Sequence, residues 1–312
     1  MNTKIRVGIT SFGSNTAIGV AKILRSVHNN VEIVGIDSNS IDETTGYRYA
    51  DYFHQVPLAS RSTEYLFAIN KIVDDRDISI LIPIHDVELM VLSGNLRALN
   101  CKVAVNSSQI IELCGNKLKS NQYASRFVKV PEYGTEKVSK ETRVIIKSID
   151  GVGSKDIKVQ NDCLGEKVPK GFFWQNFISG TEYTVDCYRS YISDDFFAYP
   201  RIRRETKGGI ATKTLGIKNS ELIAISQSIL EGLDYRGVAN IQFIENNGEY
   251  FFIEINPRFA GSGILSYSNG LNAPSWTVDE LVGDIVDFSR VKLEYNKKMV
   301  RYFNEVFHEI DS

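Results

Sequence analysis

One carboxylate lies in an unusual setting: Glu254 sits inside the apolar run YFFIEI, which continues into NPRFAGSG. An ionised carboxylate without a partner is very unfavourable in an apolar interior, so Glu254 is expected to face a cation. Asn256 follows on the same strand pattern, and Asn240 and Gln242 lie in the apolar stretch before it. A carboxylate flanked by carboxamide oxygens is a hard ligand set that suits Mg²⁺, with Mn²⁺ as the alternative. The competing interpretation is a solvated polar face on an edge hairpin.

Whether these side chains share one face depends on the turn of the hairpin VANIQFIENNGEYFFIEI. With a two-residue turn at 247–248, Gln242 would face away from Glu254, because side chains alternate along a strand. A three-residue loop over 246–248, closed by a left-handed glycine in a bulge, turns the polar side chains of both strands to one face. We therefore expect the three-residue loop.

Lys147 ends the apolar strand RVIIK and is followed by the glycine-rich segment SIDGVGSKDI. An ammonium beside such a loop suits a polyphosphate, because glycines let backbone N–H groups approach phosphate oxygens. Gly151, Gly153 and Ser154 are therefore candidate phosphate contacts, although the segment is not a Walker A motif. An ordinary surface turn is the competing interpretation. Arg258, just after the strand with the carboxylate, adds a forked donor for phosphate oxygens.

Three further segments each allow two interpretations. The cationic segment PRIRRETKGGIATKT, with Arg201 and Lys213 as its candidate catalytic residues, could bind a substrate carboxylate or close on phosphates; the alternative is a solvated charged hairpin. Asp86 and Glu88 follow a strand end, where open sheets bind ligands, but capping of a helix by Asp86 is the favoured explanation. The AGSG run at 260–263 could cradle a substrate or form a tight turn.

The elements that position these residues change character along the chain. Residues 1–106 alternate short apolar strands with amphipathic helices, which predicts a small doubly wound domain with a parallel sheet. A helix is expected over 109–125, followed by strands that alternate in the manner of an antiparallel sheet. From Trp276 onward the tail is expected to be mostly helical, with the apolar piece 299–307 packing back. The expected fold class is α/β followed by α+β.

Composition argues against several classes of partner. With 36 Lys and Arg against 38 Asp and Glu, the net charge is -2, so no overall field draws the chain to nucleic acid or an anionic membrane. No apolar run approaches the ~18 residues of a membrane span, and no secretory leader is expected before the first strand. The 4 cysteines lack metal-ligand spacing and are expected as reduced thiols of a cytoplasmic protein.

Six motifs occur in order along the chain: Lys117, Pro131, Lys147 with its glycine-rich loop, Gln175-x-Phe177-Ile178-x-Gly180-x-Glu182, Gln242, and Glu254-x-Asn256-Pro257-Arg258. Their order resembles the ATP-grasp superfamily, nearest to the large chain of carbamoyl-phosphate synthase and similar carboxylate–amine ligases. The resemblance covers nearly the whole chain. It implies a pre-ATP-grasp domain at 1–106, a small lid subdomain with its preceding helix at 107–180, and a large subdomain with the metal site and C-terminal helices at 181–312.

In that family ATP lies between two α+β subdomains, and the resemblance implies a role for each motif. It implies phosphate contacts for Lys117, Lys147, Gly151, Gly153 and Ser154. It implies adenine contacts for Gln175, Phe177 and Ile178, and a ribose contact for Glu182. It implies metal ligation for Gln242, Glu254 and Asn256, and stabilisation of the transferring phosphoryl group for Arg258. Gln242 stands where other branches of the family carry a second carboxylate. The implied metal site therefore has fewer negative charges and depends more on ATP oxygens as ligands.

The implied reaction is a two-step ligation, in which ATP phosphorylates a carboxylate and an amine captures the acylphosphate. The implied partners are small-molecule carboxylate and amine substrates, together with ATP and Mg²⁺. The oligomeric state is left open, with a homodimer as one candidate. One alternative is phosphorylation of bicarbonate or carbamate, as in carbamoyl-phosphate synthase; another is a non-catalytic nucleotide-binding module. A dehydrogenase is disfavoured, because GITSFGSNTAIG lacks the G-x-G-x-x-G fingerprint.

Overall fold

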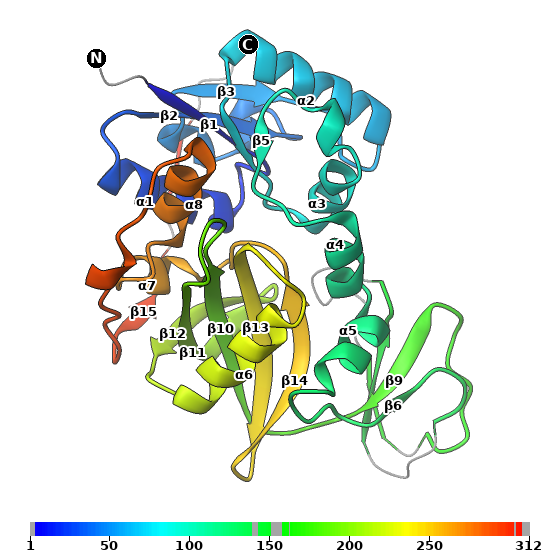
Figure 1. Ribbon diagram of the computed structural model, residues 1–312. Helices are drawn as coiled ribbons and strands as arrows, with labels where there is room; N and C mark the ends of the chain where they lie inside the picture. The colour runs from blue at the N-terminus through cyan, green and yellow to red at the C-terminus, as the bar shows by residue number, and fades with distance from the viewer. Residues whose placement is uncertain (1–3, 139–142, 151–157, 162, 303, 308–312) are drawn as a thin grey trace.

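The computed structural model describes residues 4–138, 143–150, 158–161, 163–302 and 304–307. Within these residues the strands form three sheets (Figure 1). A parallel sheet comes from the first third of the chain, a four-stranded sheet from the middle and a six-stranded sheet from the second half. The fold class, α/β followed by α+β, is confirmed. The expected domain boundaries stay predictions; the strands of the three sheets lie within 5–103, 133–176 and 181–300.

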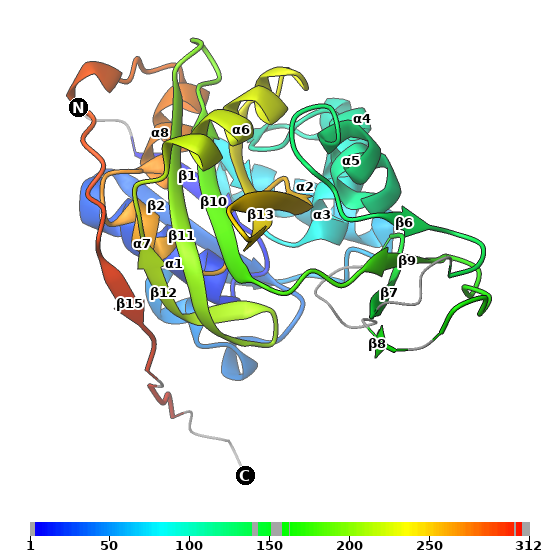
Figure 2. The same cartoon turned by 90° about the horizontal axis from the view of Figure 1, so that it is seen from below.

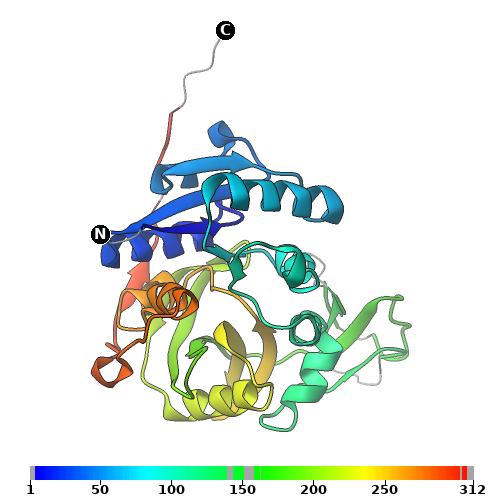
Figure 3. The same ribbon diagram turned by 45° about the horizontal axis from the view of Figure 1, so that its top comes forward.

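The parallel sheet is doubly wound. Its elements are β1 (Ile5–Ile9), α1 (Asn15–Val27), β2 (Val31–Asp37), β3 (Tyr52–Gln55), α2 (Ser62–Arg76), β4 (Ile80–Ile82), α3 (Asp86–Ser93) and β5 (Lys102–Val103). Alternate strand residues pack against α1 and against α2 in two separate apolar clusters, so helices cover both faces (Figure 3). The strand order β3-β2-β1-β4-β5 reverses direction between β1 and β4. Open α/β sheets bind ligands beside the carboxyl ends of the strands at such a point.

Side-chain caps set where the helices beside this point begin. Ser14 accepts a hydrogen bond from the backbone N–H of Ala17 and caps α1. His85 caps α3, and the Glu88 side chain accepts from the backbone N–H of His85 to complete a capping box. The expected capping role of Asp86 is therefore wrong, because Asp86 is the first helical residue and its carboxylate is used elsewhere.

The helix expected over 109–125 is two helices, α4 (Ser108–Gly115) and α5 (Lys117–Ala124). Asn116 separates them with extended backbone angles, and its side chain accepts from the backbone N–H of Lys119. An asparagine that can cap a new helix thus ends the previous one. The break puts Lys117 at the start of α5, where the helix turns toward the six-stranded sheet.

The six-stranded sheet has the order β14-β13-β10-β11-β12-β15 and is antiparallel throughout. Its strands are β10 (Thr181–Arg189), β11 (Phe196–Lys207), β12 (Ile210–Gly216), β13 (Gly237–Asn246), β14 (Glu249–Asn256) and β15 (Lys298–Val300). One face packs its apolar residues against α6 (Ser220–Glu231). The other face carries alternating polar residues toward the parallel sheet and its helices.

The four-stranded sheet is smaller and lies to one side of the six-stranded sheet (Figure 2). Its strands are β6 (Tyr133–Gly134), β7 (Val144–Ser148), β8 (Lys158–Gln160) and β9 (Phe172–Asn176). It has an apolar cluster of its own around Val144, Ile146 and Trp174. The connection from β9 to β10 joins it to the six-stranded sheet.

The C-terminal segment is not the expected helical tail. After α7 (Ile264–Tyr267) and α8 (Ala273–Val282), it is mostly non-helical and contains the edge strand β15, which pairs with β12. Met299 packs into the main apolar cluster, but Tyr302 and Phe307 are 85% and 90% exposed, so the expected packing of that piece is only partly met. The described residues also include the 3₁₀ helices η1 (Ile41–Glu43), η2 (Gly46–Tyr49), η3 (Leu96–Ala98) and η4 (Phe288–Arg290).

The helix α8 ties the two large sheets together. It packs against α1, and His28 Nε2 lies 2.7 Å from Ser275 Oγ. The same apolar cluster contains Ile9 of the parallel sheet and Tyr188 of the six-stranded sheet, so the two share one core. In the described part of the chain, no helix has the length and apolar character needed to cross a membrane.

Candidate active site

The hairpin of β13 and β14 closes with two residues, and the expected three-residue loop is wrong. Asn247 and Gly248 both have positive φ, 51° and 81°, which is the primed turn that Asn-Gly favours. Gln242 nevertheless pairs with Glu254, because Ile253 is an extra residue in β14 and forms a bulge. Because of the bulge, Gln242 and Glu254 lie on the same face of the sheet, which the two-residue turn alone would not allow.

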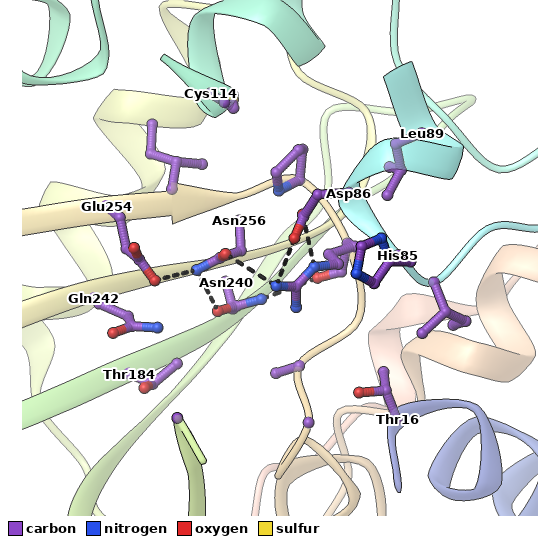
Figure 4. A pocket seen from close by; sticks show the side chains of 18 of the residues that line it. Thr16, His85, Asp86, Leu89, Cys114, Thr184, Asn240, Gln242, Glu254 and Asn256 are labelled. Carbon is purple, nitrogen blue, oxygen red and sulfur yellow. Dashed lines mark hydrogen bonds and ion pairs between the residues drawn. The ribbon is translucent and has the colours of Figure 1, made fainter. Parts of the chain in front are cut away.

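Four polar side chains therefore lie on one face of the six-stranded sheet, with Asn240 opposite Asn256 and Gln242 opposite Glu254 (Figure 4). They border a cavity of about 470 Å³. Its other wall comes from the residues that follow β1 and β4, among them Ser11, Ser14, Ile84, His85 and Asp86. The cavity thus opens at the point where the strand order of the parallel sheet reverses, as expected for a ligand site in an open sheet.

Asn256 connects the carboxylate to its neighbours. Its Nδ2 donates to Glu254 Oε1 at 2.9 Å and lies 3.3 Å from Asn240 Oδ1, while its Oδ1 accepts from Arg258 Nη2 at 3.2 Å. The amide thus turns its nitrogen toward Glu254. For both side chains to bind one cation, this amide must make a half-turn that brings its oxygen beside the carboxylate.

Arg258 is held from across the cavity by the parallel-sheet region. Its Nε and Nη2 donate to the two carboxylate oxygens of Asp86, at 2.8 and 3.1 Å (Figure 4). Its Nη1 also lies 3.4 Å from the carbonyl oxygen of Phe259. Because Nε and Nη2 are taken, Nη1 is the part of the guanidinium best placed to meet a ligand. The ion pair with Arg258 is thus the interaction that the Asp86 carboxylate makes.

Arg201 lines the same cavity and makes a second ion pair. Its Nε and Nη2 donate to Asp186 at 2.8 and 3.1 Å, and Ser266 Oγ donates to the same carboxylate at 2.7 Å. Lys213, the other candidate of this segment, pairs with Glu205 at 2.6 Å on an exposed part of the hairpin. It is not among the described residues that line the cavity, so its catalytic role stays a prediction that this geometry does not favour.

Two lysines lie near Glu254. Lys117 lines the cavity at the start of α5, and Lys147 is buried in β7 with its Nζ 5.2 Å from the centre of the Phe173 ring. Burial lowers the pKa of Lys117 and brings that of Lys147 to about 8, whereas the Glu254 carboxylate opposes both shifts. Ammonium groups that burial desolvates would gain stabilisation from a bound anion.

The residues expected at the adenine lie at the junction of the four- and six-stranded sheets. Gln175 is buried in β9, and its Nε2 has no partner among the described residues. Phe177 and Ile178 lie in the connection to β10, with the Phe177 ring centre 4.1 Å from the guanidinium carbon of Arg143. These residues do not border the cavity of about 470 Å³, and their adenine contacts stay predictions.

Glu182, the expected ribose residue, borders a neighbouring cavity of about 500 Å³. Its Oε2 lies 3.4 Å from Arg203 Nε, and Arg203 borders both cavities. A ligand that reached from Glu182 to Glu254 would therefore pass Arg203. The expected phosphate contacts Gly151, Gly153 and Ser154 lie outside the described residues.

Two residues of the site were missed in the sequence, Thr184, which lines the cavity, and Asp186, which supports a cavity residue. Thr184 is the cross-strand partner of both Gln242 and Arg201, and Asp186 holds Arg201. The segment TEYTVDCY alternates polar and apolar residues, so Glu182, Thr184 and Asp186 share one face of β10. That period of two was the signal that could have identified them.

The oxygen-rich face fits a Mg²⁺ ion that takes further ligands from outside the protein. In the described part of the chain, no cluster of three or more His, Cys, Asp and Glu side chains could hold a metal. Glu254 supplies one negative charge, and the amide oxygens of Gln242 and Asn256 are hard but neutral. Such a set suits Mg²⁺ that keeps waters and binds nucleotide phosphates rather than a closed protein cage. The three ligand assignments stay predictions.

Comparison with known proteins agrees with this arrangement. Residues 170–304 match a family model described as ATP-grasp in the biosynthetic pathway with Ter operon. The biotin carboxylase domain of Hydrogenobacter thermophilus 2-oxoglutarate carboxylase, solved as a dimer with MgADP, ADP and bicarbonate, superposes with a TM-score of 0.74 at 13% identity, over 96% of this chain and 74% of that one. The chain has the ATP-grasp fold. The resemblance of its motifs to that superfamily is thereby confirmed.

Other ATP-grasp structures are similar to the same extent. The L-amino acid ligase from Bacillus licheniformis gives a TM-score of 0.73 at 12% identity, over 94% of this chain and 78% of that one. N5-carboxyaminoimidazole synthetase from Staphylococcus aureus, solved with ADP, gives 0.71 at 15% identity, over 96% and 82%. No curated protein matches the chain in sequence. At these identities the likeness establishes the fold alone.

Proposed function

We propose that this chain is an ATP-dependent, Mg²⁺-dependent ligase that activates a carboxylate as an acylphosphate and joins it to an amine, forming ADP and phosphate. The observation that carries the proposal is the convergence of Glu254, Lys117 and Arg258 on one cavity of an ATP-grasp fold. These residues come from a strand, a helix start and a loop. Together they offer the metal ligand and cations that phosphoryl transfer requires.

Each group has a distinct part in the proposal. When bound with Mg²⁺, ATP supplies the phosphoryl group and its leaving group. Gln242, Glu254 and Asn256 would hold the metal, and Lys117 and Lys147 would offset charge on the phosphates. Arg258 would stabilise the transferring phosphoryl group through Nη1, which the Asp86 pair leaves accessible. No side chain need act as a nucleophile, because the substrates supply both attacking atoms.

The bond changes balance in two steps. A carboxylate oxygen attacks the γ-phosphorus, the bond to the β,γ-bridging oxygen breaks, and ADP leaves. The amine nitrogen then attacks the acyl carbon, phosphate leaves with the C–O electron pair, and the nitrogen loses a proton. Exclusion of water from the cavity would protect the acylphosphate until the amine arrives.

Bicarbonate is the second candidate for the activated acid. It is favoured by one observation, the similar biotin carboxylase domain whose structure contains bicarbonate beside MgADP. Bicarbonate is a one-carbon carboxylate, so the same arrangement of metal and cations would activate it. The two candidates differ in whether ADP release needs an organic acid.

We also propose a cytoplasmic setting. All four cysteines are free thiols, three of them buried, which suits a reducing compartment. The proposed homodimer stays a prediction.

An ADP-release assay tests the function. Purified protein with Mg·ATP would be offered small carboxylates, amino acids and bicarbonate, each with and without amines. The blank is Glu254→Gln, and the matched control is Glu249→Gln, which removes an exposed carboxylate at the other end of β14. We expect ADP release that requires a carboxylate and an amine, is abolished in the blank and persists in the control. Bicarbonate-only turnover would favour the second candidate, and nucleotide binding without turnover under any pairing would contradict the ligase.

A further inference from the structure

Two buried polar atoms at the cavity wall make no hydrogen bond in the described part of the chain, Thr184 Oγ1 and Arg203 Nε. Of the two, Arg203 Nε lies within ion-pair distance of Glu182, whereas Thr184 Oγ1 has no polar partner among these residues. A buried donor without a partner costs about 1–3 kcal/mol, so such groups are rare in native proteins unless a ligand or water completes them. Arg203 can only donate, and the Thr184 hydroxyl can donate or accept. An acceptor, such as a carboxylate oxygen, would therefore satisfy both.

Thr184 belongs to a polar row that crosses four strands. Glu254, Gln242, Thr184 and Arg201 are successive cross-strand neighbours on β14, β13, β10 and β11. At a strand spacing of roughly 4.8 Å, Thr184 lies about 10 Å and Arg201 about 15 Å from Glu254 along the row. The row thus has a carboxylate at one end and a guanidinium at the other.

Arg201 is oriented to present part of its guanidinium. Asp186 accepts from Nε and Nη2, and no described residue pairs with Nη1. Further positive charge lies close by. Burial lowers the pKa of Arg203 and of Arg301 and the Arg201 charge lowers both further, while Glu182 and Glu254 oppose the shift at Arg203. Burial thus disfavours the charged form of these two guanidinium groups, which a nearby anion would offset.

The position of the row decides which anion belongs there. The phosphates of the proposed nucleotide are expected at the Glu254 end, beside Lys117 and Lys147. Thr184 and Arg201 lie toward the opposite end, so they are placed for the other anionic substrate. We propose that Thr184 Oγ1 and Arg201 Nη1 form a carboxylate-binding subsite, which holds the carboxylate that the ligase activates. This inference rests on the proposed function.

The subsite is nearly closed. Thr184 is 1% exposed, between the longer side chains of Gln242 and Arg201 on the flanking strands. A carboxylate would enter between these side chains, with one oxygen accepting from the Thr184 hydroxyl and the other from Arg201 Nη1. The bound carboxylate would then lie one strand away from Gln242 and the predicted metal.

Thr184→Val tests the subsite, because it removes the hydroxyl and keeps the shape. Thr184→Ser restores the hydroxyl. The matched control is Thr277→Val, since Thr277 is equally buried, its Oγ1 also lacks a described partner, and it faces a separate cavity of about 10 Å³. Calorimetry would measure Mg·ADP binding, then binding of acetate, succinate, L-alanine, L-glutamate and bicarbonate to the nucleotide complex, with acetamide as the uncharged comparison.

We expect at least one carboxylate to bind the wild type and Thr184→Ser, and to bind Thr184→Val roughly 10- to 100-fold more weakly, as for loss of one charge-assisted hydrogen bond. Mg·ADP affinity should stay within about twofold in every variant, and Thr184→Val should not lower the unfolding midpoint, since no protein partner is lost. Carboxylate binding that is equal in Thr184→Val, or absent from the wild-type nucleotide complex, would overturn the subsite.

Weaker Mg·ADP binding in Thr184→Val would also overturn it, by assigning the hydroxyl to a phosphate. Failure of the wild type to bind Mg·ADP would instead contradict the proposed function itself. The nucleotide and carboxylate titrations thus separate the two failures.

Discussion

Two arginines that line one cavity, Arg201 and Arg258, each pair with an aspartate in the same geometry but in different surroundings. In both pairs Nε and Nη2 donate to the two carboxylate oxygens at 2.8 and 3.1 Å. The Arg201–Asp186 pair lies within the six-stranded sheet, with its side chains 3% and 1% exposed. The Arg258–Asp86 pair joins that sheet to the parallel-sheet region, with its side chains 20% and 23% exposed.

Burial decides what each pair can do. Opening the Arg201 pair would separate two buried charges, so it should stay closed and serve as a fixed support. The Arg258 pair borders water and the cavity, so the guanidinium can exchange part of its contact with Asp86 for a ligand at lower cost. The same two side chains thus form a rigid support in one place and an adjustable one in the other.

The largest expected difference is in stability. Asp186→Asn leaves the Arg201 charge buried without a counter-charge and should lower the free energy of unfolding by about 3–5 kcal/mol. Asp86→Asn, at the more exposed pair, should lower it by about 1 kcal/mol or less. Urea denaturation of the two variants measures both, and equal losses would remove the distinction between the pairs.

The next difference is in turnover. Arg258→Lys keeps the charge but loses the fork, and it should reduce ADP release about 100-fold through loss of transition-state stabilisation, with little change in unfolding. Lys213→Met is the control, because Lys213 pairs with Glu205 away from the cavity and should change the rate less than about twofold. If Lys213→Met proved as harmful as Arg258→Lys, the assignment of roles from cavity geometry would be wrong.

Asp86 should act through Arg258. Asp86→Asn retains a hydrogen-bonding side chain but no charge. We expect kcat to fall about tenfold with an unchanged KM for ATP, because Arg258 would be less firmly positioned but could still contact the substrate. Asp86→Glu should recover part of the rate. A rise in kcat for Asp86→Asn would show instead that Asp86 competes with the substrate for the arginine.

The main elements were predictable from the sequence because their patterns are local. Strand and helix periods predicted β1, β2, β4, β5 and α1 without knowledge of their neighbours, whereas the short strand β3 was not predicted. The break at Asn116 depends on one side-chain cap. The segment after α8 contains apolar residues that pack on other elements, although its backbone is mostly not helical. Neither effect leaves a period in the sequence.

The candidate site was only partly predictable for the same reason. The shared face of Gln242 and Glu254 was expected, yet it arises from a tight turn and a bulge at Ile253 rather than from the expected loop. The Arg258–Asp86 pair joins residues 172 positions apart, and no local pattern relates them. Sequence patterns do not reveal contacts between elements that are distant in the chain and meet only after folding.

Lys147 is another buried cation, and its charge depends on pH near neutrality. Lys147 has a pKa lowered to about 8 by burial, so it is charged at pH 7 and largely neutral at pH 9. If its charge holds nucleotide phosphates, Mg·ADP affinity should fall up to about tenfold over this range, whereas Lys147→Arg should abolish the dependence. A wild-type affinity that is independent of pH would contradict the phosphate contact.

The same shift has an opposite effect on stability. Between about pH 8 and 10.5 the unfolded chain retains the Lys147 proton that the folded protein has lost. The unfolded state then binds more protons, so this group's contribution to the free energy of unfolding rises with pH across that window. Titration of unfolding against pH in wild type and Lys147→Met measures the contribution.

The metal dependence of nucleotide binding tests the account most directly. Calorimetric titration with ADP, with and without Mg²⁺, would be carried out on the wild type and on Glu254→Gln. We predict that Mg²⁺ strengthens ADP binding at least about tenfold in the wild type and less than about twofold in the variant, because the variant lacks the only charged ligand of the predicted site. Equal strengthening in both proteins would show that Glu254 does not face the metal.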